Sequence, residues 1–202
     1  MKKILCFLAA MLMIPMVHAA PEFKEGVNYE VVKQAGSAQP EVMEFFSYFC
    51  PHCFKFEPIV DDLQKSLPEG VTLKKNPVAF LGREMGPELQ RAYAVANLLK
   101  AEDKLTPAIF DAIHVKRQVP QSRNDVEKIF VDNGVPAEEF IGAVDSFAVS
   151  GMVAQFDRNT ETYNVRGVPA FLVNGKYMVK IESITSQEQF NQLVKFLLAK
   201  KD

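Results

Sequence analysis

The sequence predicts an α/β protein whose chain is interrupted by a block of helices. Three observations predict it: an apolar strand that leads into a cysteine-bearing helix, a long central stretch of helical patterns, and a hairpin followed by a last amphipathic helix. The length of 202 residues suits one domain, or one domain with a large insertion. Hydrophobic residues make up 48% and charged residues 24%, as in ordinary globular proteins. The net charge of −2 is too near zero for a nucleic-acid-binding surface, so no nucleic-acid partner is expected.

The N-terminus is predicted to be a cleaved signal peptide, residues 1–19. Two lysines precede an apolar run at residues 4–17, and small residues follow it. A membrane anchor is the alternative, but at about 1.5 Å per residue this run is too short for a hydrocarbon core of about 30 Å. Cleavage after Ala19 makes Ala20 the mature N-terminus and removes Cys6. Export indicates a bacterial periplasm, with secretion from the cell as the alternative, and in both places thiols can oxidise.

Residues 41–48 are apolar and aromatic, and they predict a buried central strand that ends at the sequence Phe-Cys-Pro-His-Cys. Apolar residues then recur at helical spacing from Phe54 to Leu63, until a Leu-Pro-Glu-Gly sequence stops the pattern. The cysteines therefore open a helix. Residues 71–80 predict a second strand, which is interrupted by Pro77.

Helical signals dominate residues 87–163, where we expect four or five short helices. Thr106 fits an N-cap position with Pro107 as the first helical residue, since proline suits that position. Ser122 and Asp125 have capping-box spacing.

The last part of the chain returns to strand patterns. Residues 170–173 and 176–179 flank an Asn-Gly pair, which is typical of a β-hairpin turn. Ser186 and Gln189 then cap a final amphipathic helix.

Cys50 and Cys53 are the two cysteines of the mature chain, and their spacing allows a small disulfide ring. At the start of a helix the first sulfur lies where unpaired backbone N–H groups favour a thiolate. A lower pKa of the Cys50 thiol stabilises the reduced pair and makes the disulfide a stronger oxidant. His52, when cationic, adds to this effect. Cys53 lies one turn further in, so it is expected to be less exposed and to act as the resolving or leaving sulfur.

Two other roles of the pair are less favoured. A structural disulfide gains little stability from so small a loop, because the entropic benefit grows with loop length. A zinc site needs about four ligands, and the mature chain supplies only the two cysteines, His52 and the distant His114. We therefore expect no metal, and we expect His114 to be an ordinary helix residue.

Three segments of the sequence carry a family resemblance: residues 44–53 (EFFSYFCPHC), residues 166–170 (RGVPA) and residues 173–177 (VNGKY). In these segments the sequence resembles the DsbA family of periplasmic thiol–disulfide oxidoreductases, and the resemblance extends through nearly the whole mature chain. It implies a thioredoxin-like fold with an inserted all-helical domain. The discontinuous thioredoxin-like domain would comprise residues 20–84 and 158–202, and the inserted helical domain residues 85–157.

The resemblance also implies roles for residues outside the cysteine pair. Pro51 and His52, between the cysteines, belong to the expected active site. Val168–Pro169 is expected to form a cis peptide bond beside the cysteines and to pair through the Val168 backbone with a bound peptide. An ordinary trans turn is the alternative.

Two acidic residues match acids of the family. Glu44 lies in an apolar strand, where burial would raise its pKa and suit it to relay a proton to or from Cys53; the alternative is a glutamate at a sheet edge that reaches water. Glu57, four residues after Cys53, is a supporting candidate, and a solvated helix face explains it equally well.

The implied activity is that of a protein thiol:disulfide oxidoreductase. We expect a monomeric periplasmic dithiol oxidase that donates a Cys50–Cys53 disulfide to reduced, unfolded exported proteins through a mixed disulfide, with no bound cofactor. The resemblance implies reoxidation by a DsbB-like, quinone-linked membrane oxidase. The alternatives are a thioredoxin-like reductase or isomerase, and a peptide-binding chaperone that works without its thiols.

Overall fold

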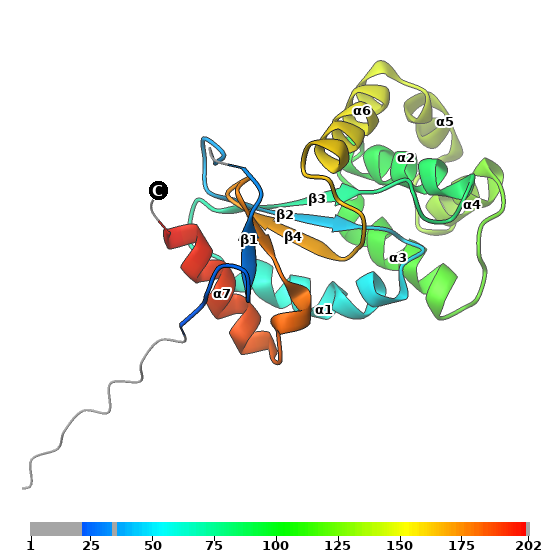
Figure 1. The fold of residues 1–202 in the computed structure, drawn as a ribbon. Helices are drawn as coiled ribbons and strands as arrows, with labels where there is room; N and C mark the ends of the chain where they lie inside the picture. The colour runs from blue at the N-terminus through cyan, green and yellow to red at the C-terminus, as the bar shows by residue number, and fades with distance from the viewer. Residues whose placement is uncertain (1–21, 34–35, 201–202) are drawn as a thin grey trace, which may run out of the picture.

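The computed structural model describes residues 22–33 and 36–200 and shows helices packed around one mixed β-sheet (Figure 1). Within these residues the sheet has five strands in the order β1-β5-β4-β2-β3. The strands are β1 (Tyr29–Val31), β2 (Glu41–Phe46), β3 (Thr72–Pro77), β4 (Ala170–Val173) and β5 (Tyr177–Val179). The predicted signal peptide lies outside the described residues. No helix among those described is long and apolar enough to span a membrane.

Strand β2 lies in the interior of the sheet, parallel to β3 and antiparallel to β4. Every β2 residue after the first is buried, because both faces of the strand are covered. On one face the strand is covered by helices α1 (Pro51–Ser66) and α7 (Gln187–Ala199), where Val42 packs with Leu63 and Leu193. On the other face Phe45 packs with Val165, which lies between the helical insertion and β4.

The predicted hairpin between β4 and β5 is confirmed. Asn174 and Gly175 both adopt positive φ angles, +52° and +60°, which asparagine and glycine tolerate better than other residues. The predicted capping of the last helix is also confirmed, since the Gln189 N–H donates to Ser186 Oγ. A short 3-10 helix, Ile181–Ser183, connects β5 to α7.

The two predicted strands before the helical block are shorter than expected. Strand β2 ends at Phe46 because the next residues form a turn, in which the Cys50 N–H donates to the Ser47 carbonyl. Strand β3 ends at Pro77, whose nitrogen has no hydrogen to donate to a ladder. The edge strand β1 was not predicted, since its three residues are too few to show an alternating pattern.

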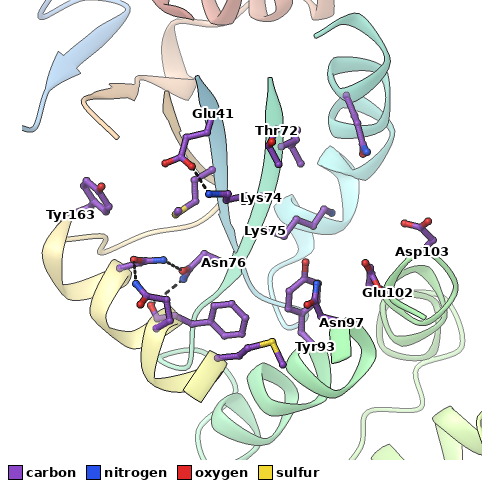
Figure 2. A pocket seen from close by; sticks show the side chains of 17 residues that line it. Glu41, Thr72, Lys74, Lys75, Asn76, Tyr93, Asn97, Glu102, Asp103 and Tyr163 are labelled. Carbon is purple, nitrogen blue, oxygen red and sulfur yellow. Dashed lines mark hydrogen bonds and ion pairs between the residues drawn. The ribbon is translucent and has the colours of Figure 1, made fainter. Parts of the chain in front are cut away.

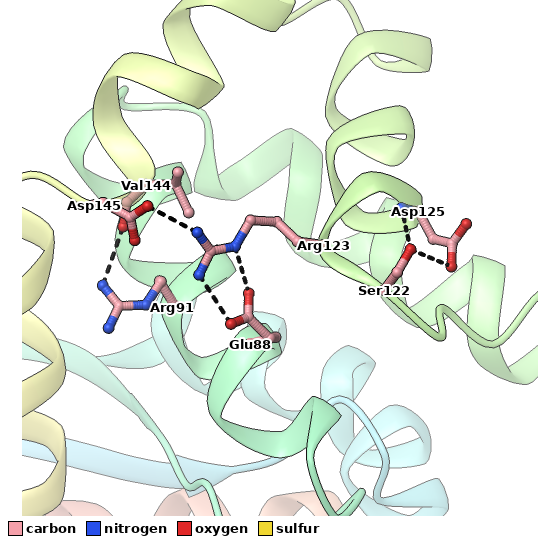
Figure 3. A network of polar contacts seen from close by, with 7 residues as sticks. All are labelled: Glu88, Arg91, Ser122, Arg123, Asp125, Val144 and Asp145. Atoms are coloured by element: carbon pink, nitrogen blue, oxygen red, sulfur yellow. Dashed lines mark hydrogen bonds and ion pairs between the residues drawn. The ribbon is translucent and has the colours of Figure 1, made fainter.

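Five helices form the insertion between β3 and β4, which confirms the helical block. They are α2 (Met85–Leu98), α3 (Glu102–His114), α4 (Arg123–Asp132), α5 (Ala137–Val144) and α6 (Phe147–Thr162). Ser122 caps α4 through the Asp125 N–H, as predicted. The Arg123 guanidinium of α4 makes two hydrogen bonds to Glu88 of α2 and one to Asp145 after α5, so one side chain holds three helices together (Figure 3).

The predicted cap at Thr106 is wrong. Helix α3 begins four residues earlier, at Glu102, and Pro107 lies inside it. Thr106 is buried and its hydroxyl lies 3.2 Å from the hydroxyl of Tyr48, in the segment that leads to the cysteines. The Thr106 side chain, which the local spacing predicted to cap a helix, therefore makes a tertiary contact with Tyr48 instead.

Asn76 of β3 joins the insertion to the sheet. Its buried side chain donates to the Phe156 carbonyl (3.1 Å) and to Thr160 Oγ1 (3.3 Å), and it accepts a hydrogen bond from Asn159 (2.9 Å). All three partners lie on α6, so these bonds fix the last helix of the insertion against edge strand β3.

A cavity of about 660 Å³ lies along β3, between this strand and helices of the insertion (Figure 2). Lys75 from β3 and Tyr93, Asn97 and Glu102 from the insertion line it, with α6 residues on the opposite side. Neither cysteine lines this cavity. The cysteine pair is therefore separate from this cavity.

Candidate active site

Cys50 and Cys53 lie at the start of helix α1, as predicted. Cys50 is the N-cap residue, and its Sγ accepts a hydrogen bond from the Cys53 backbone N–H at 3.2 Å. Pro51 takes the first helical position, where its missing N–H costs no helical hydrogen bond. Both cysteines are free thiols here, so the structure is that of the reduced pair. Cys50 is 6% exposed and Cys53 is fully buried, in the expected order.

The surroundings of the two sulfurs give the thiols opposite pKa shifts. The pKa of Cys50 is lowered to about 6, mainly by the hydrogen bond from the Cys53 thiol, with smaller effects from backbone N–H groups of Cys53 and His52 and from the charge of His52; burial acts in the other direction. The pKa of Cys53 is raised by the same thiol–thiol hydrogen bond and by burial. Cys50 is therefore the thiolate of the pair near neutral pH, and Cys53 stays protonated.

The cis peptide bond expected at Val168–Pro169 is present. The Val168 carbonyl oxygen lies 3.3 Å from Cys50 Sγ and accepts a hydrogen bond from it while Cys50 is a protonated thiol. The segment after α6 thus brings a backbone acceptor to the nucleophile from a distant part of the chain. Val168 and Pro169 are partly exposed, which leaves this backbone accessible from outside.

Glu44 is fully buried in β2, so the alternative of an edge glutamate that reaches water is wrong. Burial raises its pKa to about 7, and nearby Lys75 opposes that rise. The Lys75 ammonium lies 3.3 Å from Glu44 Oε2, although neither oxygen of the carboxylate has a partner in hydrogen-bonding geometry. Glu44 also contributes to the raised pKa of Cys53.

Glu57 does not lie on a solvated helix face. Its carboxylate accepts two hydrogen bonds from Lys75 Nζ, at 2.7 and 2.9 Å, and its pKa is raised mainly by burial. Lys75 thus lies between two carboxylates, one from β2 and one from α1. Sequence reasoning missed this lysine, because only the parallel register that pairs Glu44 with Lys75 places it in the interior.

His114 is a second residue that sequence reasoning missed. It was expected to be an ordinary helix residue, yet its Nε2 lies 2.8 Å from the Tyr48 carbonyl and its ring stacks on Phe54. His52, by contrast, is exposed beside the cysteines. Among the residues that the structure describes, no group of three or more His, Cys, Asp or Glu side chains is arranged to hold a metal ion.

The mixed sheet with its helical insertion, and the cysteine pair at the start of α1 with a cis-proline backbone beside it, define a thioredoxin-like thiol:disulfide oxidoreductase. Residues 41–195 match the family model of the DSBA-like thioredoxin domain. The chain belongs to the DsbA family.

Individual relatives agree with this assignment. The thiol:disulfide interchange protein DsbA of Pectobacterium carotovorum subsp. carotovorum is 42% identical over 192 residues, 91% of this chain and 92% of the relative. DsbA of Escherichia coli strain K12 is 37% identical over 210 residues, with both chains fully covered. The structure of Proteus mirabilis DsbA with a non-covalently bound peptide has a TM-score of 0.83 and 32% identity, covering 89% of this chain and all of that one.

Proposed function

We propose that the protein is a periplasmic dithiol oxidase that donates a Cys50–Cys53 disulfide to reduced, unfolded exported proteins. The observation that carries this proposal is the hydrogen-bonded position of Cys50 Sγ at the helix start, together with the low pKa of its thiol. A stable Cys50 thiolate lowers the free energy of the reduced pair, so the oxidised pair is a stronger acceptor of electrons.

The transfer of the disulfide takes two exchange steps. A substrate thiolate attacks Cys50 Sγ of the oxidised enzyme, so a substrate–Cys50 disulfide forms and the Cys50–Cys53 bond breaks. Cys53 leaves with the electron pair and takes up a proton, in keeping with the raised pKa of its thiol. A second substrate thiolate then attacks the substrate sulfur of the mixed disulfide and releases Cys50 as a thiolate. The substrate loses two electrons and the cysteine pair gains them.

Val168 and Pro169 are proposed to bind the substrate chain. An extended peptide can pair with the exposed backbone of Val168 as an added strand does at a sheet edge. The short distance between the Val168 carbonyl and Cys50 Sγ supports this, because a chain paired there brings its own cysteine close to the nucleophile. The peptide held by Proteus mirabilis DsbA, PWATCDS, contains one cysteine.

Glu44 is proposed to exchange the proton of Cys53. Its pKa of about 7 allows it to give or take a proton near neutral pH, as a general acid or base requires. Glu57 acts on this group through Lys75, whose position between the two carboxylates keeps the ionised form of Glu44 accessible. Pro51 and His52 complete the proposed active site.

The cellular setting and the domain division are also proposed. The signal-like N-terminus supports export to the periplasm, where a DsbB-like quinone-linked membrane oxidase would return the reduced pair to the disulfide. We propose a monomer with no bound cofactor, metal or nucleic acid. We propose residues 20–84 and 158–202 as the thioredoxin-like domain and residues 85–157 as the insertion; helix α6 runs through the second boundary.

Two cysteine variants test the mechanism. Purified Cys50→Ser and Cys53→Ser variants are first treated with oxidised glutathione, which converts an accessible thiol to a glutathione mixed disulfide. They are then mixed with a reduced unfolded protein that has one thiol, which can displace the glutathione thiolate, and disulfide-linked species are followed by mass. We expect Cys53→Ser to accumulate a mixed disulfide and Cys50→Ser to form none and to lack exchange. Full exchange by Cys50→Ser would rule out the mechanism. Aggregation assays with both cysteines replaced test the alternative of a thiol-independent chaperone.

A further inference from the structure

Helix α3 of the insertion contacts both flanks of the cysteine motif through its last residue, His114. The Nε2 atom lies 2.8 Å from the carbonyl oxygen of Tyr48, two residues before Cys50. The imidazole ring stacks on Phe54, the residue after Cys53, with ring centres 5.0 Å apart and planes 11° apart. A carbonyl oxygen only accepts hydrogen bonds, so Nε2 carries a proton and donates it.

Tyr48 is held by α3 at both of its ends. Its hydroxyl lies 3.2 Å from Thr106 Oγ1, eight residues before His114 on the same helix, and its backbone carbonyl accepts the His114 bond. Tyr48 is only 1% exposed, so water cannot replace these partners. When a buried carbonyl loses its hydrogen-bond donor, the protein is destabilised by the full desolvation penalty of that carbonyl.

The Tyr48 carbonyl belongs to the turn that sets the position of Cys50. In this turn the Cys50 N–H donates to the Ser47 carbonyl at 3.0 Å, and the Phe49 N–H donates to Ser47 Oγ at 3.2 Å. The turn delivers Cys50 Sγ to the Cys53 N–H at 3.2 Å. A change at the Tyr48 peptide is therefore transmitted through two residues to the sulfur.

We propose that His114 is a positioning residue, whose Nε2–H donor holds the Tyr48 carbonyl and thereby keeps Cys50 Sγ on the backbone N–H of Cys53. The inference rests on the proposed function, in which Cys50 is the nucleophile. It gives the helical insertion a direct part in setting the redox equilibrium. The stacking on Phe54 orients the imidazole ring, and the Nε2–H donor links helix α3 to the Tyr48 carbonyl.

Loss of the His114 Nε2–H donor is expected to make the Cys50–Cys53 disulfide a weaker oxidant. Without the His114 donor, the Tyr48 peptide shifts and the turn before Cys50 changes its conformation. The hydrogen bond from the Cys53 N–H to Cys50 Sγ then lengthens. The thiolate of Cys50 is then less stabilised, so the equilibrium between the enzyme disulfide and reduced glutathione moves toward the enzyme disulfide. The loss of one net hydrogen bond changes such an equilibrium by about three- to tenfold.

Three substitutions of His114 separate the donor from the ring. His114→Phe keeps a flat ring and loses the donor, His114→Leu loses both, and His114→Gln loses the ring but can still donate. Val115→Ala, at the exposed neighbouring position, is the matched control. The full mature protein is equilibrated in glutathione buffers, and reduced and oxidised forms are counted with a thiol-alkylating mass tag. The pH midpoint of Cys50 ionisation is measured on the same samples.

We expect His114→Phe and His114→Leu to lower the equilibrium constant for reduction of the disulfide about three- to tenfold and to raise the ionisation midpoint of Cys50. We expect His114→Gln to recover at least half of that change. Equilibrium constants within twofold of the parent for both His114→Phe and His114→Leu would overturn the proposal. So would a change in His114→Gln as large as in His114→Leu, because the ring would then be the active element. Exchange by Cys50→Ser would instead refute the proposed function itself.

Discussion

Glu44 of β2 and Lys75 of β3 lie opposite each other on parallel strands, with the Lys75 ammonium 3.3 Å from the Glu44 carboxylate. Glu57 binds the same ammonium from helix α1. One lysine thus serves two carboxylates, and Glu44 is the one with no exposed surface and no partner in hydrogen-bonding geometry. Burial is the main reason that the pKa of Glu44 is raised to about 7 despite the positive charge beside it.

Replacing Glu44 by Gln should make the folded protein more stable at alkaline pH. The folded pKa of Glu44, about 7, lies above that of an unfolded glutamate, about 4.3. Between these values the unfolded chain ionises Glu44 while the folded protein does not, so stability falls as the pH rises from about 4 to about 7 and stays low above that. We expect Glu44→Gln to gain about 1–3 kcal/mol at pH 8, partly offset by the lost contact with Lys75.

Urea unfolding of both proteins at pH 4 and pH 8 measures this gain. The prediction requires the difference between Glu44→Gln and the parent to be larger at pH 8 than at pH 4. If the parent protein were more stable than Glu44→Gln by the same amount at both pH values, the pKa of Glu44 would not be raised in the folded protein, and the prediction would be wrong.

Replacing Lys75 by Met should destabilise the protein, because two partly or fully buried carboxylates lose their shared cation. We expect a loss of about 2–4 kcal/mol at pH 8, below the usual cost of breaking a fully buried pair because Lys75 and Glu57 keep some exposure. The loss should shrink at low pH, where both carboxyl groups are protonated. Adding Glu44→Gln to Lys75→Met should restore part of the stability, and strictly additive effects in this double-mutant cycle would contradict the network.

The reaction of Cys50 with an alkylating reagent should depend on pH with a midpoint near 6. The thiolate is the reactive form, and the folded pKa of about 6 lies below the ordinary thiol value of about 8.5. The stabilisation of the thiolate is complete above about pH 8.5 and is lost as the pH falls through 6. His52→Ala should raise the midpoint only slightly, since the charge of His52 is a minor cause of the shift. A midpoint near 8.5 in the parent would refute the assignment of the nucleophile.

Replacing Asn76 by Leu should weaken the attachment of the insertion to the sheet. The substitution removes the bonds to Phe156, Thr160 and Asn159 of α6 and leaves their polar atoms in a poorly hydrated contact. We expect a loss of about 2–3 kcal/mol in urea unfolding. Arg158→Ala, at an exposed position on α6, is the control and should change stability by less than about 0.5 kcal/mol. Equal effects of the two substitutions would show that Asn76 is not an anchor.

Much of the fold was predictable from local patterns. The apolar run before Cys50 and the helical spacing after Cys53 predict β2 and α1, and the Asn-Gly pair predicts the hairpin, because each signal lies within a few residues of the structure it forms. Thr106 and Pro107 show the limit of such signals. Their spacing matches a helix start, yet the contact of Thr106 with Tyr48 lies inside α3.

A residue of the site could be predicted from the sequence where its side chain differs in polarity from its neighbours along the chain. Glu44 is conspicuous as an acid within an apolar strand, whereas Lys75 follows Lys74 in a strand with alternate exposed positions and looks like a solvated residue. Only the register of β2 against β3 distinguishes Lys75 from Lys74, whose side chain is 53% exposed. His114 is hidden for a similar reason, since helical spacing identifies neighbours on its own helix and not the distant Tyr48 carbonyl.

A redox titration of the mature protein tests the central claim most directly. The protein is equilibrated in buffers with a series of ratios of reduced to oxidised glutathione, quenched with a thiol-alkylating mass tag, and counted by mass, because the chain has no tryptophan to report the change. If Cys50 is a stabilised thiolate, the pair stays reduced even in mildly oxidising buffer. A pair that stays oxidised against excess reduced glutathione would contradict the account and favour a reductase or a structural disulfide.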